Sequence, residues 1–413
     1  MATTRPAPAA TMPAAPARSR SALGQWNSAV TSYYVLAGAT ALLLVLGLVM
    51  VLSSSSIDSL ADGRSPYAEF LDQTKYAFVG LPTLVLLARA PVSWLRRIAW
   101  PALLLALGFQ ALVFTPLGCG SGGNRNWVCL PGVSAQPSEV IKLALALWLG
   151  AVLATKLPLL ASWKHALVPA VPIAAFAIFV VLLGHDLGTA LVLILLVFGA
   201  LWVAGVKLRM FVVPVVVAAA VTVPLVVLNG NRSGRVKAWL GGACDQAGDC
   251  YQALHGTWAL ATGGWGGLGL GQSREKWSYL PAAHNDFVFA IIGEELGLLG
   301  TLLVLVLFGL LAFAMVRVIR RHTDPFARIA TGAICCWVVG QALVNIAVVV
   351  GLLPVIGVPL PLVSAGGSAL IMTMAALGVV LAFARSEPGA AEALAARPSV
   401  LRRSLAVLGR ARG

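Results

Sequence analysis

The chain has 413 residues, of which 59% are hydrophobic and 11% are charged, and its formal net charge is +14. A mean hydropathy of +0.89 is too apolar for a water-soluble globular chain of this length. We therefore expect an all-α polytopic membrane protein.

The chain begins with a stretch that has no apolar periodicity and is rich in Ala, Pro, Thr and Arg. Residues 1–28 are expected to form a disordered cytoplasmic tail, because such a composition buries too little surface to offset chain entropy. The apolar segment that follows is about twenty residues long, which is a spanning length. A cleavable signal peptide has a shorter apolar region, so we do not predict one.

Ten apolar segments follow and define a membrane domain over residues 29–386. The second is short and can borrow flanking residues, and the eighth is long enough to tilt. An even number of spans places both termini on one side of the membrane. The approximate bounds are 33–52, 76–87, 98–114, 140–154, 167–183, 187–206, 211–228, 287–316, 329–350 and 370–384.

Basic residues decide which side that is, because short loops rich in Lys and Arg stay in the cytoplasm. They gather in alternate loops on the side of the termini, and in both tails, including a basic tail at 387–413. We therefore predict cytoplasmic termini and interpret the net charge as a topology signal rather than as a nucleic-acid surface. The loop residues are Arg89, Arg96, Arg97, Lys156, Lys164, Lys207, Arg209, Arg317, Arg320, Arg321 and Arg328.

With that orientation the outward loops are residues 53–75, 115–139, 184–186, 229–286 and 351–368. The fourth is the longest, and loops of that length without their own secondary structure are usually functional or disordered.

Four cysteines fall in these outward loops, on the oxidising face. Cys119 and Cys129 bracket one loop, and Cys244 and Cys250 lie in another. We favour Cys119–Cys129 and Cys244–Cys250 disulfides, although four cysteines allow three pairings. Free outward thiols are the alternative.

Three polar clusters fall at membrane depth, where charges need partners. Glu139 and Lys142 share a helix face at three-residue spacing, and Asp186 lies in a very short outward turn. We expect these three to form one structural charge network. Glu294 and Glu295, about two turns into the eighth segment, form the third cluster.

Asp286 lies at the boundary between the longest outward loop and the eighth apolar segment. A carboxylate at this depth must be solvated, paired with a cation or donor, or have a role in function. Asp is also a favoured helix N-cap, because it accepts from the first free backbone N–H groups and suits the positive end of the helix dipole. The position alone leaves both interpretations open.

A glycine-rich stretch at residues 263–271 precedes this boundary and has the look of a nucleotide-binding loop. The context excludes that reading, since no strand precedes the stretch and it lies outside the cell. We interpret it as flexible backbone that shapes a lipid groove, with Trp265, Trp277 and Tyr279 at interface depth.

The connection at 351–368 is apolar but carries three prolines and a Gly-Gly pair. It cannot form a regular helix. Irregular backbone near the membrane is tolerated only where protein buries it or where it lines a wet cavity. We predict a re-entrant wall beside the long outer loop.

Four motifs of the sequence, in this order, resemble those of the SEDS family (shape, elongation, division and sporulation). The resemblance covers roughly residues 33–384. Residues 276–281 and 292–297 are closer to the division members of the family than to its elongation members. The motifs are Gln136-Pro137-Ser138-Glu139-x-x-Lys142, Asp186-Leu187-Gly188-Thr189, Leu280-Pro281-x-Ala283-His284-x-Asp286-Phe287 and Pro354-x-x-Gly357-x-Pro359-Leu360-Pro361-x-x-Ser364-x-Gly366-Gly367-Ser368.

The chain departs from the family pattern at a few positions. It has Gly184-His185 where the family usually has Gln-Pro, Ala282 where it has Glu, and Asn285 where it has Thr. These departures argue that those positions are dispensable, and they leave Asp286 intact.

The resemblance implies a peptidoglycan glycosyltransferase that polymerises lipid II at the outer face of the cytoplasmic membrane, at the division septum. A sugar hydroxyl on one lipid-linked disaccharide would attack the anomeric carbon of the growing strand and expel undecaprenyl pyrophosphate. A hydroxyl is a weak nucleophile until a carboxylate takes its proton. Asp286 is therefore the candidate general base.

A departing pyrophosphate needs cations, for which guanidinium is well suited. The candidates are basic residues of the longest outer loop, for each of which a solvated loop charge is the alternative: Arg232, Arg235, Lys237, Arg274 and Lys276. The family motifs add His284, Ser364, Gly366, Gly367 and Ser368 as substrate-binding candidates. The resemblance also suggests a divalent cation, Mg or Mn, shared with pyrophosphate, since no cluster forms a dedicated metal site.

The resemblance implies a class B penicillin-binding protein as partner, with other membrane proteins of the divisome, because this chain has no soluble domain to crosslink peptides. A lipid II flippase is the main alternative, and it would need polar groups through the whole bilayer. An elongation-type polymerase and a scaffold that only recruits a transpeptidase are further alternatives.

Overall fold

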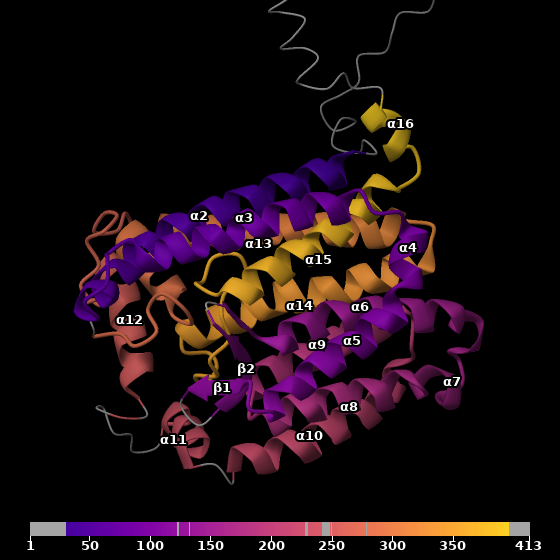
Figure 1. Ribbon diagram of the computed structural model, residues 1–413, viewed down its shortest axis with the longest axis horizontal. Helices are drawn as coiled ribbons and strands as arrows, with labels where there is room; N and C mark the ends of the chain where they lie inside the picture. The colour runs from indigo at the N-terminus through magenta and orange to yellow at the C-terminus, as the bar shows by residue number, and fades with distance from the viewer. Residues whose placement is uncertain are drawn as a thin grey trace, which may run out of the picture.

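The computed structural model describes residues 30–395, apart from 122–123, 132, 228–229, 242–247, 249 and 278. The predicted tail at 1–28 and most of that at 387–413 lie outside these residues. The described chain is mostly helical, and its long helices run in a common direction (Figure 1). The helices are α2 (Thr31–Ala61), α3 (Ala68–Ala88), α4 (Val92–Arg97), α5 (Ala99–Ala111), α6 (Pro137–Thr155), α7 (Trp163–Leu167), α8 (Ala170–Leu183), α9 (Leu187–Val203), α10 (Val212–Val227), α11 (Gly230–Trp239), α12 (Tyr251–Gly263), α13 (Val288–Arg321), α14 (Pro325–Val349), α15 (Gly367–Arg385) and α16 (Ala390–Ala395).

Six helical segments of the described chain are long and apolar enough to cross a membrane: Thr31–Ala61, Pro137–Thr155, Trp163–Leu183, Val288–Arg321, Pro325–Val349 and Gly367–Arg385. A helix occupies each of the ten predicted apolar segments, although several bounds differ. The first helix continues through its polar end to Ala61, and the second begins at Ala68 instead of residue 76. The short second segment thus borrows flanking residues.

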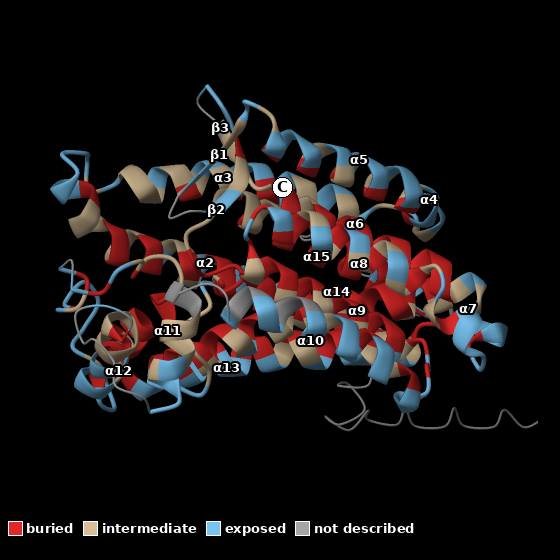
Figure 2. Ribbon diagram, turned by 90° about the horizontal axis from the view of Figure 1, so that it is seen from below, coloured by how far each residue is buried: buried red, intermediate tan, exposed pale blue. Residues whose placement is uncertain are grey.

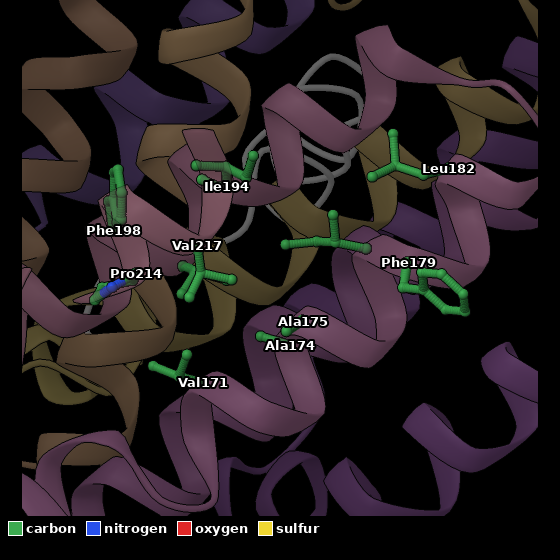
Figure 3. A pocket seen from close by; sticks show the side chains of 12 residues that line it. Val171, Ala174, Ala175, Phe179, Leu182, Ile194, Phe198, Pro214 and Val217 are labelled. Carbon is green, nitrogen blue, oxygen red and sulfur yellow. The ribbon is translucent and has the colours of Figure 1, made fainter. Parts of the chain in front are cut away.

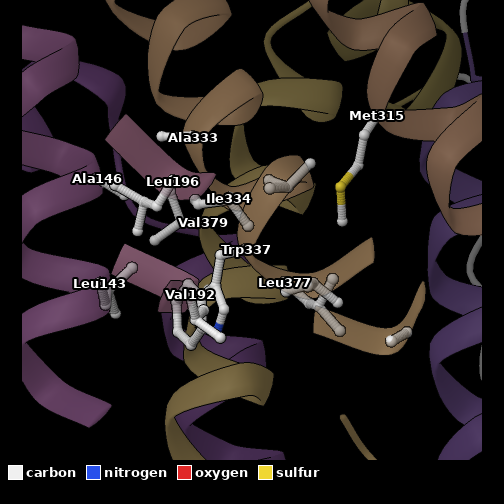
Figure 4. Close-up of a cluster of buried hydrophobic side chains, with 14 of the residues drawn as sticks. Leu143, Ala146, Val192, Leu196, Met315, Ala333, Ile334, Trp337, Leu377 and Val379 are labelled. Atoms are coloured by element: carbon white, nitrogen blue, oxygen red, sulfur yellow. The ribbon is translucent and has the colours of Figure 1, made fainter. Parts of the chain in front are cut away.

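The core lies along α14, which packs against α6, α9, α13 and α15. Figure 2 shows α14 and α9 mostly buried and α5, α8 and α10 with exposed outer faces. Figure 4 shows part of this core, where Trp337 and Ile334 of α14 meet Leu196 of α9 and Leu377 of α15. These apolar contacts fix the positions of the helices that carry the polar residues described below.

A small antiparallel sheet corrects the expectation of an all-α protein. Its strands are β1 (Gly118–Ser121), β2 (Asn124–Leu130) and β3 (Val133–Ala135). A disulfide joins Cys119 of β1 to Cys129 of β2. The backbone N–H of Arg125 donates to the carbonyl of Gly184 at 3.0 Å, which attaches the sheet to the turn between α8 and α9.

The longest outer loop is not irregular throughout, because it contains α11 and α12. Both lie at the same end of the bundle as the sheet (Figure 1). Cys250, just before α12, is also disulfide-bonded. Its predicted partner, Cys244, lies outside the described residues.

Helix α13 is interrupted at Gly297, which has φ 66°. The glycine-rich stretch at 263–271 supplies backbone partners at this break. The N–H of Leu268 donates to the carbonyl of Glu294 at 2.9 Å, and the N–H of Leu298 donates to the carbonyl of Gly264 at 2.9 Å. A Cβ atom on Gly297 would lie 2.4 Å from the nitrogen of Gly267. The glycines therefore allow close backbone approach, which the interpretation as a flexible groove did not foresee.

No helix forms between α14 and α15, as the prolines and glycines at 351–368 predict. Side chains of α14 bind the carbonyl groups of this segment. The amide of Gln341 donates to Pro359 at 2.8 Å, and that of Asn345 donates to Val358 at 2.7 Å. The segment is thus a wall held by the core.

The described chain starts and ends at one end of the bundle (Figure 1). There the guanidinium of Arg321, near the end of α13, lies 3.4 Å from the carboxylate of Glu387, which follows α15. The sheet, α11 and α12 lie at the opposite end, and so does the start of α13. The residues with predicted chemistry therefore gather at the end remote from the termini.

Candidate active site

Asp286 lies in the turn before α13 and is not its N-cap. The cap position is Phe287, and no side chain caps the helix there. This overturns the N-cap interpretation. The turn is held through its backbone, because Asn345 donates to the carbonyl of Asp286 at 2.7 Å and Ser364 donates to that of Asn285 at 2.6 Å.

A cavity of about 660 Å³ opens beside this turn. It is bounded by α6, α9, α11, strand β2 and the irregular segment before α15. The charged residues that line it are Glu139, Lys142, Asp186, Arg235 and Asp286. The structure therefore brings together residues that are far apart in the sequence and that had been singled out from different motifs.

The Asp286 carboxylate lies against the irregular segment. A Cβ atom on Gly357 would lie 3.4 Å from Oδ2 of Asp286, and Gly357 has φ +79°. Burial raises the pKa of Asp286 to about 6, and the positive charge of Arg235 acts in the opposite direction. A carboxylate with this pKa is a stronger base than an exposed one and is still ionised near neutral pH.

Among the predicted cations whose side chains the structure describes, Arg235 reaches the cavity. It is half-buried on α11, the helix that follows α10. Lys237 is exposed and does not line the cavity. The backbone of Arg232 belongs to α11, but its side chain lies outside the described residues.

Glu139 and Lys142 form a buried ion pair within α6, with 2.7 Å between Oε1 and Nζ. Lys142 also donates to Oε1 of Gln341 at 3.2 Å and lies over the ring of Trp337 at 5.3 Å. This pair is compensated in place, as buried charges require.

Asp186 takes other partners, so the predicted network of Glu139, Lys142 and Asp186 divides into two parts. Its carboxylate caps α9 by accepting from the N–H of Thr189 at 2.9 Å. It also accepts from the side-chain amides of Gln136 at 2.8 Å and Asn126 at 3.1 Å. Three neutral donors satisfy the carboxylate, and a direct pair with Lys142 is not needed.

Glu294 and Glu295 form a second polar network, away from the cavity. Lys276 Nζ lies 3.1 Å from Glu295 Oε1, and Ser53 of α2 donates to the same carboxylate at 2.7 Å. Ser273 donates to Glu294 at 2.5 Å. Lys276 is 3% exposed and Glu295 is fully buried. Lys276, which had been a pyrophosphate candidate, therefore neutralises a buried carboxylate instead.

The other predicted binding residues have different partners, and only Ser364 bonds the backbone of the turn through its side chain. His284 Nδ1 lies 3.4 Å from Asp58 Oδ2 at the outer end of α2. Ser368 accepts from the backbone N–H of Gln136 at 3.2 Å. Gly366 lines the cavity, whereas Ser364, Gly367, Ser368 and His284 do not. Arg274 is exposed and its N–H donates to Glu294 at 2.9 Å.

Several cavity residues were not predicted from the sequence. Asn124, Asn126 and Trp127 come from β2, and Gln341 comes from α14. A glutamine inside an apolar segment is itself a signal, since polar groups at membrane depth need a partner or a use. The strand residues gave no such signal, because their loop had no recognisable strand pattern.

Within the described part of the chain, no group of three or more His, Cys, Asp or Glu side chains is placed to hold a metal ion. The cavity nevertheless combines a carboxylate of raised pKa, a guanidinium and an open volume. Such a site can accept a proton from a hydroxyl and stabilise a departing anion.

Comparisons with known sequences agree over most of the chain. Residues 34–388 match the model of the FtsW/RodA/SpoVE family, described as cell cycle protein. The chain is 42% identical over 385 residues to a Mycobacterium tuberculosis (strain ATCC 25618 / H37Rv) protein named probable peptidoglycan glycosyltransferase FtsW, covering 92% of this chain and 73% of that protein. It is 33% identical over 349 residues to stage V sporulation protein E of Bacillus subtilis (strain 168), covering 84% and 95%.

Solved structures share the fold. One is a chain from a study of the structural coordination of polymerization and crosslinking by a peptidoglycan synthase complex, with a TM-score of 0.70, 28% identity and coverage of 86% of this chain and 98% of that one. Another is the rod shape determining protein RodA of Thermus thermophilus, with a TM-score of 0.64, 28% identity and coverage of 86% and 97%.

Proposed function

Since the chain belongs to the FtsW/RodA/SpoVE family, and its curated relatives are named as peptidoglycan glycosyltransferases, we propose that it polymerises lipid II into glycan strands during septal cell-wall synthesis. The 42% identity to proteins named FtsW supports the division role over the elongation role. The observation that carries the proposal is the shared cavity of Asp286 and Arg235.

Asp286 is the proposed general base. It would take the proton of the sugar 4-hydroxyl as that oxygen attacks the anomeric carbon of the growing strand, which inverts that centre. Two features support this role. The pKa of Asp286 is raised to about 6 by burial, and its backbone is fixed by Asn345, so that the carboxylate is positioned before substrate binds.

Arg235 is the proposed partner of the leaving group. Pyrophosphate develops negative charge as the glycosidic bond breaks, and a guanidinium can bind two phosphate oxygens at once. Arg232 and Lys237 are proposed as auxiliary cations on the same helix. A divalent cation, Mg or Mn, shared with the pyrophosphate would supply further charge neutralisation, and the carboxylates that line the cavity are Glu139, Asp186 and Asp286.

We further infer the membrane arrangement. The ten apolar segments would all span the cytoplasmic membrane, with both termini in the cytoplasm and the cavity at the outer surface, where lipid-anchored substrates lie. The positive-inside distribution of the loops supports this orientation. A class B penicillin-binding protein is the proposed crosslinking partner, and the fold shared with a chain of a peptidoglycan synthase complex supports it.

Polymerisation of detergent-solubilised lipid II by the purified protein with its cognate transpeptidase tests the proposal. Wild type is expected to form glycan strands on a gel, and Asp286→Ala is expected to reduce the rate by about 10²- to 10⁴-fold, the usual contribution of general base catalysis. Asp72→Asn, at an exposed aspartate of α3, is the matched control and should retain activity.

The outcomes separate the alternatives because detergent removes the two compartments that a flippase needs. If wild type and Asp286→Ala both form glycan strands, the protein is a polymerase but Asp286 is not its general base. Strands from neither, while a known polymerase works in parallel, would favour a flippase or a scaffold.

A further inference from the structure

Strand β2 forms one side of the cavity described above and brings two amides and an indole to it, those of Asn124, Asn126 and Trp127. In a regular strand, successive side chains point to opposite faces. Here the register shifts, because Cys119 of β1 pairs with Trp127 whereas the residue after Cys119 pairs with Arg125. Asn126 is therefore an extra residue in β2. Such a bulge re-aims a side chain, and it allows the neighbours Asn126 and Trp127 to line the same cavity.

This edge of the cavity is fixed by bonds that do not depend on a ligand. The guanidinium of Arg125 donates to the carbonyl of Thr115 at 2.6 Å, and its backbone N–H binds the turn between α8 and α9. The disulfide between Cys119 and Cys129 joins β1 to β2 beside Trp127, which is the cross-strand neighbour of Cys119. The β2 side chains are thus positioned before a substrate binds, which lowers the entropic cost of binding.

Most other polar groups of the cavity already have partners. Glu139 and Lys142 neutralise each other, and Asp186 accepts three hydrogen bonds. Among the residues that the structure describes, the side chains of Asn124 and Trp127 have no hydrogen-bond partner. Trp127 is half-buried and Asn124 is exposed, so both can meet a ligand in the cavity.

An indole beside a free amide suits a sugar ring. The C–H face of a sugar is apolar and slightly positive, and it packs against the negative face of an aromatic ring. Hydroxyl and acetamido groups need both donors and acceptors, and one amide side chain supplies both. The narrow crevice between α8, α9 and α10 offers neither, because all of its lining side chains are apolar (Figure 3).

We propose that Trp127 and Asn124 bind an N-acetylated sugar ring of the lipid-linked substrate, Trp127 by stacking and Asn124 by hydrogen bonds. The inference rests on the proposed function and adds the residues that hold a sugar in the cavity of Asp286. The growing strand and the incoming lipid II both carry such rings, so the same chemistry serves a donor ring or an acceptor ring.

Photocrosslinking of the wild-type protein tests the proposal without any mutation. The probe is lipid II in which a diazirine replaces the methyl group of a sugar N-acetyl, and the labelled peptides are identified by mass spectrometry. Labels are expected on β2, between Asn124 and Trp127. A second probe carries the diazirine on the stem peptide of lipid II. If the peptide probe labels β2 and the sugar probe does not, the strand binds the peptide and the proposal is wrong.

Substitutions at Trp127 separate stacking from simple burial, because Trp127→Tyr keeps an aromatic face and Trp127→Leu keeps only apolar volume. Trp127→Leu should raise KM for lipid II about three- to tenfold with little change in kcat, since stacking on a sugar acts alike on the bound substrate and the transition state. Trp127→Tyr should stay close to wild type. Trp258→Leu removes an exposed indole of α12 that does not line the cavity, and it should leave KM unchanged. Equal KM values for Trp127→Leu and wild type would reject the site.

Two modified substrates identify which ring Trp127 binds. Lipid II without the 4-hydroxyl of its terminal sugar can act only as donor, and lipid II with a non-cleavable phosphonate in place of the sugar phosphate can act only as acceptor. Each is varied while the other is saturating. If Trp127→Leu raises KM for the first alone, Trp127 holds the donor ring, and if it raises KM for the second alone, Trp127 holds the acceptor ring. Either result supports the sugar site, and no rise for either substrate rejects it.

The two proposals fail in different ways. If the sugar probe labels β2 but wild type forms no glycan strands, the sugar site stands and the polymerase is rejected. If wild type forms strands and the sugar probe labels other elements, the polymerase stands and the sugar site is rejected. If Trp127→Leu does not fold, Asn124→Leu at an exposed position repeats the kinetic test, and the wild-type labels still decide.

Discussion

Two buried glutamate–lysine pairs in this protein have similar geometry, although the partners are three residues apart in one pair and 19 in the other. Glu139 and Lys142 lie 2.7 Å apart, and Glu295 and Lys276 lie 3.1 Å apart. All four side chains are almost completely buried. The first pair lines the cavity that Asp286 also lines, and the second joins α2, the outer loop and the interrupted α13 without reaching that cavity.

The difference teaches what a buried charge does and does not indicate. Burial of a charge demands compensation whatever its role, so both pairs satisfy the same requirement. Chemistry additionally needs open volume and a group whose protonation can change. Within the described residues, Asp286 meets this need, because hydrogen bonds hold its backbone and no salt bridge occupies its carboxylate.

The largest expected effect is the loss of stability when the ion pair between Lys276 and Glu295 is broken. Lys276→Met leaves Glu295 uncompensated in a fully buried position, and loss of one partner of a buried pair costs about 3–5 kcal/mol. We expect a large fall in the thermal midpoint and in the yield of folded protein. The protein that does fold should retain its polymerisation rate, since Lys276 does not line the cavity.

The control for that prediction also removes the negative charge that Lys276→Met leaves unpaired. Lys276→Met combined with Glu295→Gln should recover much of the lost stability, because no unpaired charge remains. A folded and stable Lys276→Met protein with greatly reduced polymerisation would show that the second pair takes part in chemistry, and the contrast between the two pairs would disappear.

A smaller but still clear effect is expected at the break in α13. Gly297→Ala places a methyl group 2.4 Å from the nitrogen of Gly267, on a backbone of positive φ. Strained backbone of this kind costs of order 1–3 kcal/mol, so the thermal midpoint should fall. Gly309→Ala in the same helix meets nothing within 4 Å and should leave stability unchanged or slightly higher. Equal midpoints for the two variants would contradict the role of the glycine-rich stretch.

The sequence predicts the parts of this molecule that follow from composition and local backbone chemistry. A helix occupies each of the ten apolar segments that hydropathy picks out, and the prolines at 354, 359 and 361 exclude helix there. Spacing predicts that Glu139 and Lys142 meet, because residues three apart share a helix face. Each of these predictions depends on neighbours in the chain.

Prediction from the sequence fails where the role of a residue depends on partners that lie far away along the chain. Lys276 and Arg235 lie in the same basic loop, and their roles differ because α11 reaches the cavity and residues 273–276 reach α13 instead. Asp186 was expected beside Lys142, yet strand β2 supplies Asn126 from an unpredicted sheet. The glycine-rich stretch was interpreted as flexible for the same reason, since the carbonyl groups it binds lie in a distant helix.

The smallest expected effect is a shift of the pH–rate profile, which tests the assignment of Asp286 as the general base. The pKa of Asp286 is raised to about 6, and a general base acts in its ionised form. The polymerisation rate of wild type should therefore rise with pH through about 6 and then level off. Arg235 favours the ionised carboxylate, so its removal should raise the pKa of Asp286 further. Arg235→Gln should thus move the acidic limb of the pH–rate profile to higher pH.

Two measurements separate this shift from the other proposed role of Arg235. Loss of a pyrophosphate contact lowers the height of the pH–rate profile and leaves the position of its acidic limb unchanged, whereas loss of a neighbouring charge moves the limb. Lys237→Gln removes the same charge at an exposed position of α11 that does not line the cavity, so its limb should stay with that of wild type. If Arg235→Gln changes only the height, Asp286 does not sense Arg235 during catalysis. If the limb moves to lower pH, the titrating group is not a carboxylate stabilised by this cation, and the base must lie elsewhere on the cavity wall.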